Sequence, residues 1–315
     1  MFFTSGGTEA NNLVINGCLN GLGIKNIITS RIEHKAVLKT SKVLAEHYGA
    51  SIHYLSVNDK GQISLEELEC LLQKNRNCLV SLMHANNEIS VLNPVQKIGE
   101  LCRKYDAYFH SDMVQAVGHY KLDLKKLNVD FSSSSAHKFH GPKAAGFCYV
   151  NKDRVRIPSQ IIGGSQERNL RAGTENVTGI CGLVKALEVA EKSMQKDRQY
   201  IEKLKERMIS GLNTIHPEFK FLGTSDNEGL YTVLSVLFPS FVKHDTLVMR
   251  LDMKGVEASG GSACASGVQK QSHVIEQILN DEKAAVIRFS FSKMNTIEEV
   301  DFALNVVDNI INKEK

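Results

Sequence analysis

Residues 132–143 read Ser-Ser-Ser-Ser-Ala-His-Lys-Phe-His-Gly-Pro-Lys, between a short apolar stub at 129–131 and an apolar run at 145–150. This pattern predicts two buried strands joined by a tight loop, with Lys138 on the loop. Partial burial and the neighbouring His137 would both lower the pKa of Lys138, which favours the neutral amine that forms an imine with a carbonyl group. The nearby serines could donate hydrogen bonds to a phosphate. A polar turn with a solvated lysine is the alternative that this stretch alone allows.

Strand-like and helical segments alternate on the N-terminal side of this stretch. Strands are predicted for residues 26–29, 51–57, 78–83 and 107–110, and helices for residues 36–48, 65–74 and 95–105. Such alternation implies βαβ crossovers and an α/β fold with a mostly parallel sheet, in which ligands bind at the carboxyl ends of the strands. Five polar segments that follow strands are therefore expected to converge on one site: residues 5–8, 33–34, 86–88, 112–115 and 137–138.

Length and composition bound the possible functions. The chain has 315 residues, of which 42% are apolar and 23% charged, and its formal net charge is +3. This small charge favours neither direct nucleic-acid binding nor a polybasic membrane patch, and no apolar run reaches membrane-spanning length. The first residues also lack the features of a signal peptide.

The seven cysteines have no zinc-binding spacing, so no metal site is expected. Their odd, scattered set fits reduced thiols and a cytoplasmic location. Six of them stand beside apolar residues and are expected to be small core side chains. Cys264 is the exception, because it lies in the run Ser-Gly-Gly-Ser-Ala-Cys-Ala-Ser-Gly at 259–267, which cannot bury much surface. This setting predicts a mobile, accessible and reactive thiol.

The second half of the chain departs from the alternating rhythm. Two long helical patterns are predicted between about residues 177 and 215, and a domain boundary is placed along them, near Lys192. The predicted domains are therefore a large one over residues 1–191 and a small α+β domain over residues 192–315. The small domain has predicted strands at 219–222, 231–238 and 287–291, and helices at 244–251 and 297–311.

The polar residues at the expected site suit pyridoxal phosphate, a cofactor that needs an imine-forming lysine, an acid for its pyridine nitrogen, a flat group over its ring and donors for its phosphate. The candidates are Lys138 for the imine, Asp112 for the pyridine nitrogen, His34 for stacking, Asn87 and Gln115 for the phenolic oxygen, and Gly7, Thr8, Ser135 and His137 for the phosphate. Each residue has an ordinary alternative: a helix cap for His34, a turn for Asp112 and an exposed loop position for His137.

Three arginines also point to anions. Arg168 and Arg171 precede a Gly-Thr pair and a helix, which suits either a second phosphate or carboxylate contact or a solvated basic loop. Arg288 stands in a half-buried strand, where a substrate carboxylate would be a good bidentate partner. An internal salt bridge is the alternative for Arg288.

Taken together, these motifs resemble the cysteine desulfurases, which are class V aminotransferase-like, fold-type I pyridoxal phosphate enzymes. The motifs run in order along the whole chain: Thr-Ser-Gly-Gly-Thr-Glu-Ala-Asn-Asn at 4–12, Glu-His at 33–34, Ala-Asn-Asn-Glu at 85–88, Ser-Asp-Met-Val-Gln-Ala-Val-Gly at 111–118, Ala-His-Lys at 136–138, Gln-Glu-Arg at 166–168, Arg-Ala-Gly-Thr-Glu-Asn at 171–176 and Ser-Ala-Cys at 262–264. The Ser-Ala-Cys run resembles the group of these enzymes with a long mobile catalytic loop.

The resemblance implies a homodimer that converts L-cysteine to L-alanine and leaves the sulfur as a persulfide on Cys264. That sulfur would pass to an acceptor protein, such as an iron–sulfur cluster scaffold or a thiolation enzyme. Lys138 would form the Schiff base and shuttle the α-proton, and His34 would stack on the ring. Arg288 would bind the substrate carboxylate near Asn87. Thr174 of the partner subunit would join the phosphate contacts.

The sequence departs from this family pattern at its start. The enzymes that it resembles carry an N-terminal segment with an Asp-Asn-Ala-Ala-Thr-like motif near the active site, and this sequence begins after it. Without that segment, the substrate pocket is expected to close less completely. The alternatives are a selenocysteine lyase or another class V enzyme, and, from a different class, a truncated non-catalytic subunit or scaffold.

Overall fold

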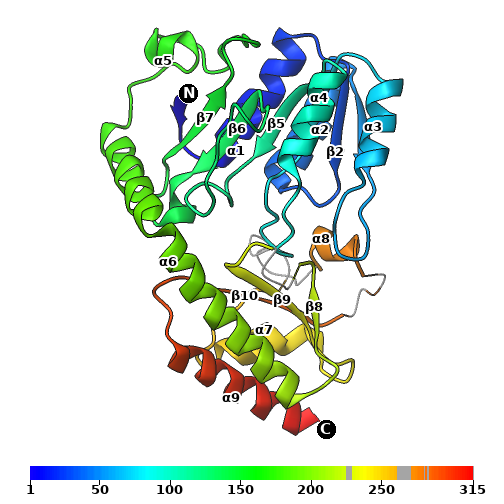
Figure 1. Ribbon diagram of the computed structural model, residues 1–315, viewed down its shortest axis with the longest axis vertical. Helices are drawn as coiled ribbons and strands as arrows, with labels where there is room; N and C mark the ends of the chain where they lie inside the picture. Colours follow the sequence, from blue (N-terminus) through cyan, green and yellow to red (C-terminus); the bar gives the residue numbers. More distant parts are fainter. Residues whose placement is uncertain (225–228, 261–270, 280, 282–283, 315) are drawn as a thin grey trace. The chain divides into compact units, whose positions relative to one another are not determined.

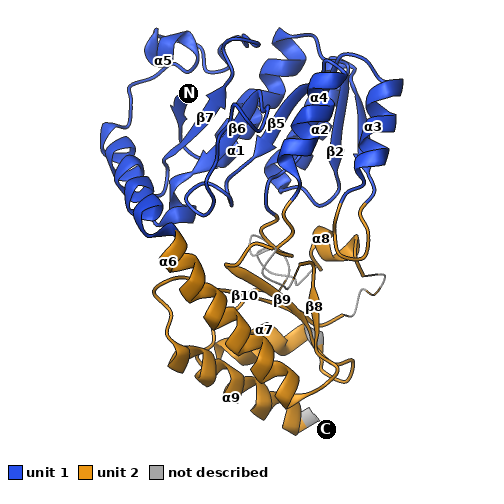
Figure 2. Cartoon of the chain, viewed as in Figure 1, with its two compact units in different colours: residues 1–56, 63–85, 93–194 blue, residues 57–62, 86–92, 195–315 orange. Residues whose placement is uncertain are grey.

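The computed structural model describes residues 1–224, 229–260, 271–279, 281 and 284–314. The chain divides into two compact units (Figure 2). Unit 1 comprises residues 1–56, 63–85 and 93–194, and unit 2 comprises residues 57–62, 86–92 and 195–315. Among the described residues, no helix is long and apolar enough to cross a membrane.

Unit 1 contains a seven-stranded sheet with the strand order β1-β7-β6-β5-β4-β2-β3 (Figure 1). The strands are β1 (Phe2–Thr4), β2 (Asn26–Ser30), β3 (Ser51–Leu55), β4 (Cys78–Ser81), β5 (Tyr108–Asp112), β6 (Phe131–Ser135) and β7 (Gly146–Val150). The pairs from β3 through β2, β4 and β5 to β6 are parallel, whereas β7 is antiparallel to both β6 and β1. The α/β fold with a mostly parallel sheet, predicted from the alternation of strands and helices, is confirmed.

Helices cover both faces of this sheet, as a parallel sheet requires. They are α1 (Gly7–Asn16), which continues as a π-helical turn Gly17–Gly21, α2 (Lys35–Tyr48), α3 (Leu65–Lys74) and α4 (Val95–Lys104). Alternate strand residues point to opposite faces, so Ile27 packs with α1 and α2 whereas Ile28 packs with α3 and α4. The carboxyl ends of the strands are thereby fixed between two packed layers.

The run of four serines lies in a strand rather than in a loop. Residues 132–135 form most of β6, and all four side chains are buried. The turn is shorter than predicted: a 3₁₀ turn, Ala136–Phe139, carries Lys138 and leads toward β7. Serine is small enough to pack under helices, and backbone pairing with β5 and β7 satisfies the polar main chain of β6.

Two further differences concern residues 177–215. Residues 177–215 form one helix of 39 residues, α6 (Val177–Ile215), instead of two. This helix follows a short irregular helix, α5 (Gln166–Asn169). Cys181, expected in the core, is exposed on α6, whereas Cys18, Cys78, Cys102 and Cys148 are buried as predicted.

Unit 2 contains a three-stranded antiparallel sheet, β10-β9-β8. Its elements are β8 (Lys220–Leu222), β9 (Val233–Leu237), α7 (His244–Asp252), α8 (His273–Glu276), β10 (Val286–Ser290) and α9 (Ile297–Glu314), together with the C-terminal part of α6. Unit 2 also takes in the loop segments 57–62 and 86–92, which precede most of unit 1 in the sequence. The change from one unit to the next within α6 lies between Met194 and Gln195 (Figure 2).

Candidate cofactor and substrate site

The start of α1 has the features of an anion-binding turn. Gly6 has a φ of 148°, which favours glycine, and no side chain caps the helix start. The first N–H groups of α1 are therefore available to a phosphate, as is the positive end of the helix dipole. A Cβ at Gly7 would lie 2.5 Å from Cγ2 of Val114, so only glycine fits there. Thr8 is exposed on the first turn of the helix.

The end of β6 lies beside this turn. The Ser135 hydroxyl is within 3.3 Å of the position that a Cβ at Gly6 would take. The same hydroxyl is 2.9 Å from Nδ1 of His137. Burial lowers the pKa of His137, and the charges of Lys138 and Lys143 lower it further. The structure thus brings together the predicted phosphate contacts Gly7, Ser135 and His137.

Asp112 is held rigidly at the carboxyl end of β5. Its side chain is buried, Oδ2 accepts a hydrogen bond of 2.7 Å from Nδ2 of Asn11, and Oδ1 accepts one of 3.0 Å from N of Val114. Carboxylate oxygens have further lone pairs, so a ring N–H can still bind here. Sequence reasoning missed Asn11, although it lies on α1 one turn after Gly7. Gln115, on the turn after β5, is half-buried.

His34 caps α2. Its Nδ1 accepts a hydrogen bond of 3.1 Å from N of Ala36, so the ordinary alternative for this residue is correct. The cap fixes the ring at the carboxyl end of β2, and the side chain remains exposed. Capping and stacking on a flat cofactor are therefore compatible, because the cap uses a ring nitrogen in the ring plane whereas stacking uses the ring face.

Lys138 is exposed, so the partial burial predicted for it is absent from this structure. Its backbone is nevertheless well fixed. The carbonyl of Lys138 lies 3.0 Å from Nε2 of His119, and N of Gly141 donates to O of Ala136 over 2.8 Å. Lys138 thus stands on a closed turn that directly follows Ser135 and that also carries His137.

Two buried titratable groups lie near Asp112: Glu33, which was expected at the site without a role of its own, and His110, which was not expected there. Glu33 is fully buried, and burial raises its pKa to about 8, with the charge of Asp112 adding to the shift. His110 is fully buried on β5 between the hydroxyls of Ser81 (2.8 Å) and Ser133 (3.0 Å), and burial lowers its pKa to about 3. A histidine and serines in neighbouring buried strands were the available signal for this network.

Unit 2 brings Asn87 and Arg288 together. Nη1 of Arg288 donates to O of Asn87 over 3.1 Å, and Nη2 donates to Oγ of Ser259 over 3.3 Å. Nε of Arg288 is buried and has no hydrogen-bond partner among the residues that the structure describes. Within the part of the chain that the structure describes, no ion pair involves Arg288. A guanidinium with a spare buried donor suits an anionic ligand better than the internal salt bridge considered above.

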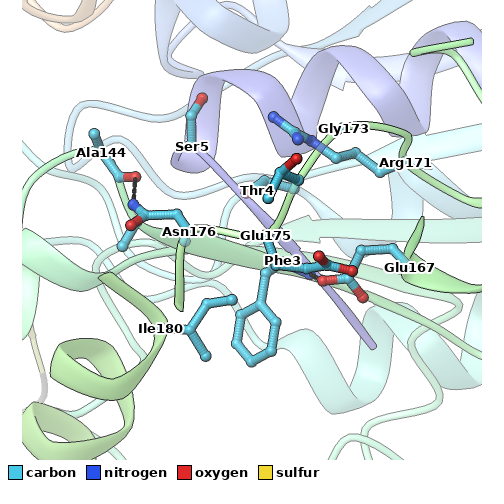
Figure 3. Close-up of a pocket in the computed structure, with 13 residues that line it drawn as sticks. Phe3, Thr4, Ser5, Ala144, Glu167, Arg171, Gly173, Glu175, Asn176 and Ile180 are labelled. Atoms are coloured by element: carbon cyan, nitrogen blue, oxygen red, sulfur yellow. Dashed lines mark hydrogen bonds between the residues drawn. The ribbon is translucent and has the colours of Figure 1, made fainter. Parts of the chain in front are cut away.

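A cavity of about 210 Å³ in unit 1 lies next to the glycine turn at the start of α1 (Figure 3). Thr174 lines it together with Thr4 and Ser5. Arg171, another lining residue, pairs with Glu9 over 3.0 Å. Burial raises the pKa of Glu9, but hydrogen bonds from Arg171 and Ser5 outweigh this effect and hold the pKa below its usual range.

Cys264 lies outside the described residues. Within the described ranges, no cluster of histidine, cysteine, aspartate and glutamate could hold a metal ion. Four described groups of unit 1 fit an aromatic cofactor that carries a phosphate. They are a glycine turn at a helix start, a fixed buried carboxylate, an exposed imidazole and a lysine.

Known proteins resemble this chain over nearly its whole length. The model of the family "Aminotransferase class-V" matches residues 1–302. Cysteine desulfurase IscS of Clostridium botulinum is 42% identical over 320 residues, which cover 100% of this chain and 80% of that protein. Cysteine desulfurase IscS of Methanosarcina thermophila is 41% identical over 317 residues, which cover 99% of this chain and 77% of that protein.

Solved structures of NifS-like proteins have the same fold. A NifS-like protein superposes with a TM-score of 0.88 at 36% identity, covering 99% of this chain and 82% of that one. A NifS-like protein of Rickettsia africae superposes with a TM-score of 0.85 at 30% identity, covering 99% and 81%. The predicted resemblance to the cysteine desulfurases and the fold-type I architecture are confirmed. The chain therefore belongs to the aminotransferase class-V family of pyridoxal phosphate-dependent enzymes.

Proposed function

We propose that this chain is a cysteine desulfurase that converts L-cysteine to L-alanine and keeps the sulfur as a persulfide on Cys264. The observation that carries the proposal is the fixed carboxylate of Asp112, which Asn11 and Val114 hold at the carboxyl end of β5. Such a carboxylate suits a pyridine nitrogen that must stay protonated. The relatives named cysteine desulfurase support the choice of substrate.

The cofactor, when bound, supplies an electron sink for the substrate α-carbon. Gly7, Thr8, Ser135 and His137 would bind its phosphate, and Lys138 would hold it covalently through Nζ. His34 would cover one ring face and exclude water from it. Asn87 and Gln115 would donate hydrogen bonds to its phenolic oxygen.

Two side chains would act on the substrate itself. Arg288 would bind the carboxylate of cysteine through the donors that its contacts with Asn87 and Ser259 leave over. Nζ of Lys138, once neutral, would take the α-proton and later return a proton to carbon. These roles stay predictions for each residue.

The sulfur-transfer step balances without an external oxidant. The Cys264 thiolate attacks the substrate sulfur, so a sulfur–sulfur bond forms while the bond between that sulfur and the substrate Cβ breaks. The electron pair of the broken bond stays with the carbon skeleton, which takes up protons and leaves as alanine. The persulfide then passes its outer sulfur to an acceptor protein, for which an iron–sulfur scaffold or a thiolation enzyme is a candidate.

We extend the proposal to a homodimer in the cytoplasm, with Thr174 of each subunit serving the phosphate site of the other. Apolar side chains near Thr174 support a second copy as the partner. Ile162 is 92% exposed and Val177 is 65% exposed. Val184, two turns after Val177 on α6, is also exposed. A subunit surface of this kind gains stability when a partner covers it.

Product analysis of the purified holoenzyme tests the proposal. With L-cysteine it should form alanine, and borohydride reduction followed by peptide mapping should place the pyridoxyl group on Lys138. Lys138→Ala should lose the visible absorbance of the bound cofactor, whereas the matched control Lys143→Ala should keep it. A pyridoxyl group on Lys143, or a holoenzyme that forms no alanine, would contradict the proposal.

A further inference from the structure

Two hydrogen bonds hold segment 86–92 on β9, in the sheet of unit 2. Oγ of Ser235, on β9, donates to O of Glu88 over 2.6 Å. Oγ of Ser90 donates to O of Val233, also on β9, over 2.6 Å. All four of these residues are buried. Asn87, which precedes Glu88, is therefore fixed to β9 rather than carried on a free loop.

The side chain of Glu88 adds a second attachment that the proposed mechanism does not use. It is buried, and its Oε2 accepts a hydrogen bond from Oγ of Ser272. Ser272 is itself buried and caps α8, because its Oγ also accepts from N of Val274 over 3.1 Å. A buried carboxylate is costly unless it is hydrogen-bonded, and a hydroxyl that donates to it makes a strong charge-assisted contact.

The guanidinium of Arg288 is aligned on the same segment. Arg288 lies directly opposite Ser235 in the β9–β10 register. Its Nη1 donates to the carbonyl of Asn87, which is the peptide unit that joins Asn87 to Glu88. A shift of Glu88 would therefore move the oxygen that orients Arg288. The segment also turns tightly here, since Oδ1 of Asn86 accepts from N of Glu88 (2.8 Å) and N of Ile89 (3.1 Å).

We propose that Glu88 is a positioning residue for substrate binding: its buried contact with Ser272 fixes the Asn87 carbonyl that aligns Arg288 with the substrate carboxylate. The inference rests on the proposed function only for the role of Arg288. Glu88 acts through Arg288 and does not touch the substrate, so it sets how well the carboxylate is held.

Binding of 3-mercaptopropionate to the holoenzyme, measured by calorimetry, tests this directly. The probe has a carboxylate and a thiol but no amine, so it reports on carboxylate binding without reacting through the cofactor. Glu88→Ala should raise its Kd about tenfold, which corresponds to about 1.4 kcal/mol. Glu88→Gln retains an oxygen that accepts from Ser272 and should raise the Kd only about threefold. Steady-state assays with L-cysteine should show the same order in KM, with kcat changed far less.

Ser272→Ala keeps Glu88 and provides an independent variant, for which the Kd should also rise severalfold. Glu67→Gln is the matched control, because Glu67 accepts from Ser56 in unit 1, outside the site, and the Kd should stay unchanged. Unchanged binding in the Glu88 and Ser272 variants would overturn the inference. Tighter binding would overturn it too, because it would mean that Glu88 merely competes with the substrate for Arg288. If the wild type binds the probe but forms no alanine, the proposed function fails while this inference is still tested.

Discussion

Replacing Glu33 by glutamine should remove a pH dependence from the stability of unit 1. Glu33 is fully buried, and its Oε1 accepts hydrogen bonds from N of Met83 (2.9 Å) and Oγ of Ser30 (3.2 Å). Burial, with a smaller contribution from Asp112, raises its pKa to about 8 from an ordinary value of 4.5. The folded chain therefore carries a neutral Glu33 at a pH where the unfolded chain has lost that proton.

The sign and size of this pH dependence follow from the linkage between proton binding and folding. Between the two pKa values the folded state binds one more proton than the unfolded state, so stability falls as pH rises. The stabilising proton contributes fully below the unfolded pKa and is lost as pH rises through the folded one. Each pH unit corresponds to about 1.36 kcal/mol, which gives a loss of roughly 4 kcal/mol between pH 5 and pH 8.

Urea unfolding of the wild type and Glu33→Gln at pH 5, 6, 7 and 8 measures this loss. The difference in unfolding free energy between the two proteins should shift by roughly 4 kcal/mol over that range, against the wild type at high pH. Burial lowers the pKa of His110 and His84, which makes both proteins less stable at acidic pH, but this effect cancels in the difference. A difference that stays constant with pH would refute the neutral Glu33, and Glu67→Gln should give such a constant difference as a control.

Three further changes test the cofactor side of the site. Gly7→Ala should cost about 1–3 kcal/mol of stability and weaken cofactor binding, because its Cβ meets Cγ2 of Val114 at 2.5 Å; Val114→Ala in the same chain should restore stability. His34→Ala should lose about 1 kcal/mol of helix-cap stability as well as cofactor affinity, whereas His34→Asn, which keeps a capping acceptor, should lose affinity alone, as thermal melts and cofactor titrations would show. Asn11→Ala removes a donor from Asp112 and should weaken cofactor binding about tenfold in a fluorescence titration, with no loss if Asn11 plays no part.

The sheet could be predicted because its strands bury both faces and alternate with helices of ordinary length. The serine strand could not, since four hydroxyls in a row carry no apolar signal, and only the pairing of β6 with β5 and β7 accounts for their burial. Similarly, a helical pattern over 177–215 was predicted, but not its continuity as one helix.

In the site, Asp112 and the glycine turn follow from local sequence, because each stands where a strand ends. The partners that fix them do not. Asn11 is 101 residues from Asp112 in sequence, and Ser235 is 147 residues from Glu88. Such contacts depend on which segments the fold brings together. For the same reason, the sequence placed Asn87 among the loops of the sheet, whereas its segment packs with unit 2.

Persulfide-trapping mass spectrometry of the wild type after exposure to L-cysteine, with an alanine assay of Cys264→Ala alongside, tests most directly whether Cys264 accepts the substrate sulfur. One added sulfur is expected on the peptide that contains Cys264, and Cys264→Ala should lose alanine formation with the cofactor still bound. Cys181→Ala, which removes a thiol exposed on α6, should leave both readouts unchanged. Undiminished alanine formation by Cys264→Ala, or added sulfur only on another cysteine, would contradict the role of Cys264 as sulfur acceptor.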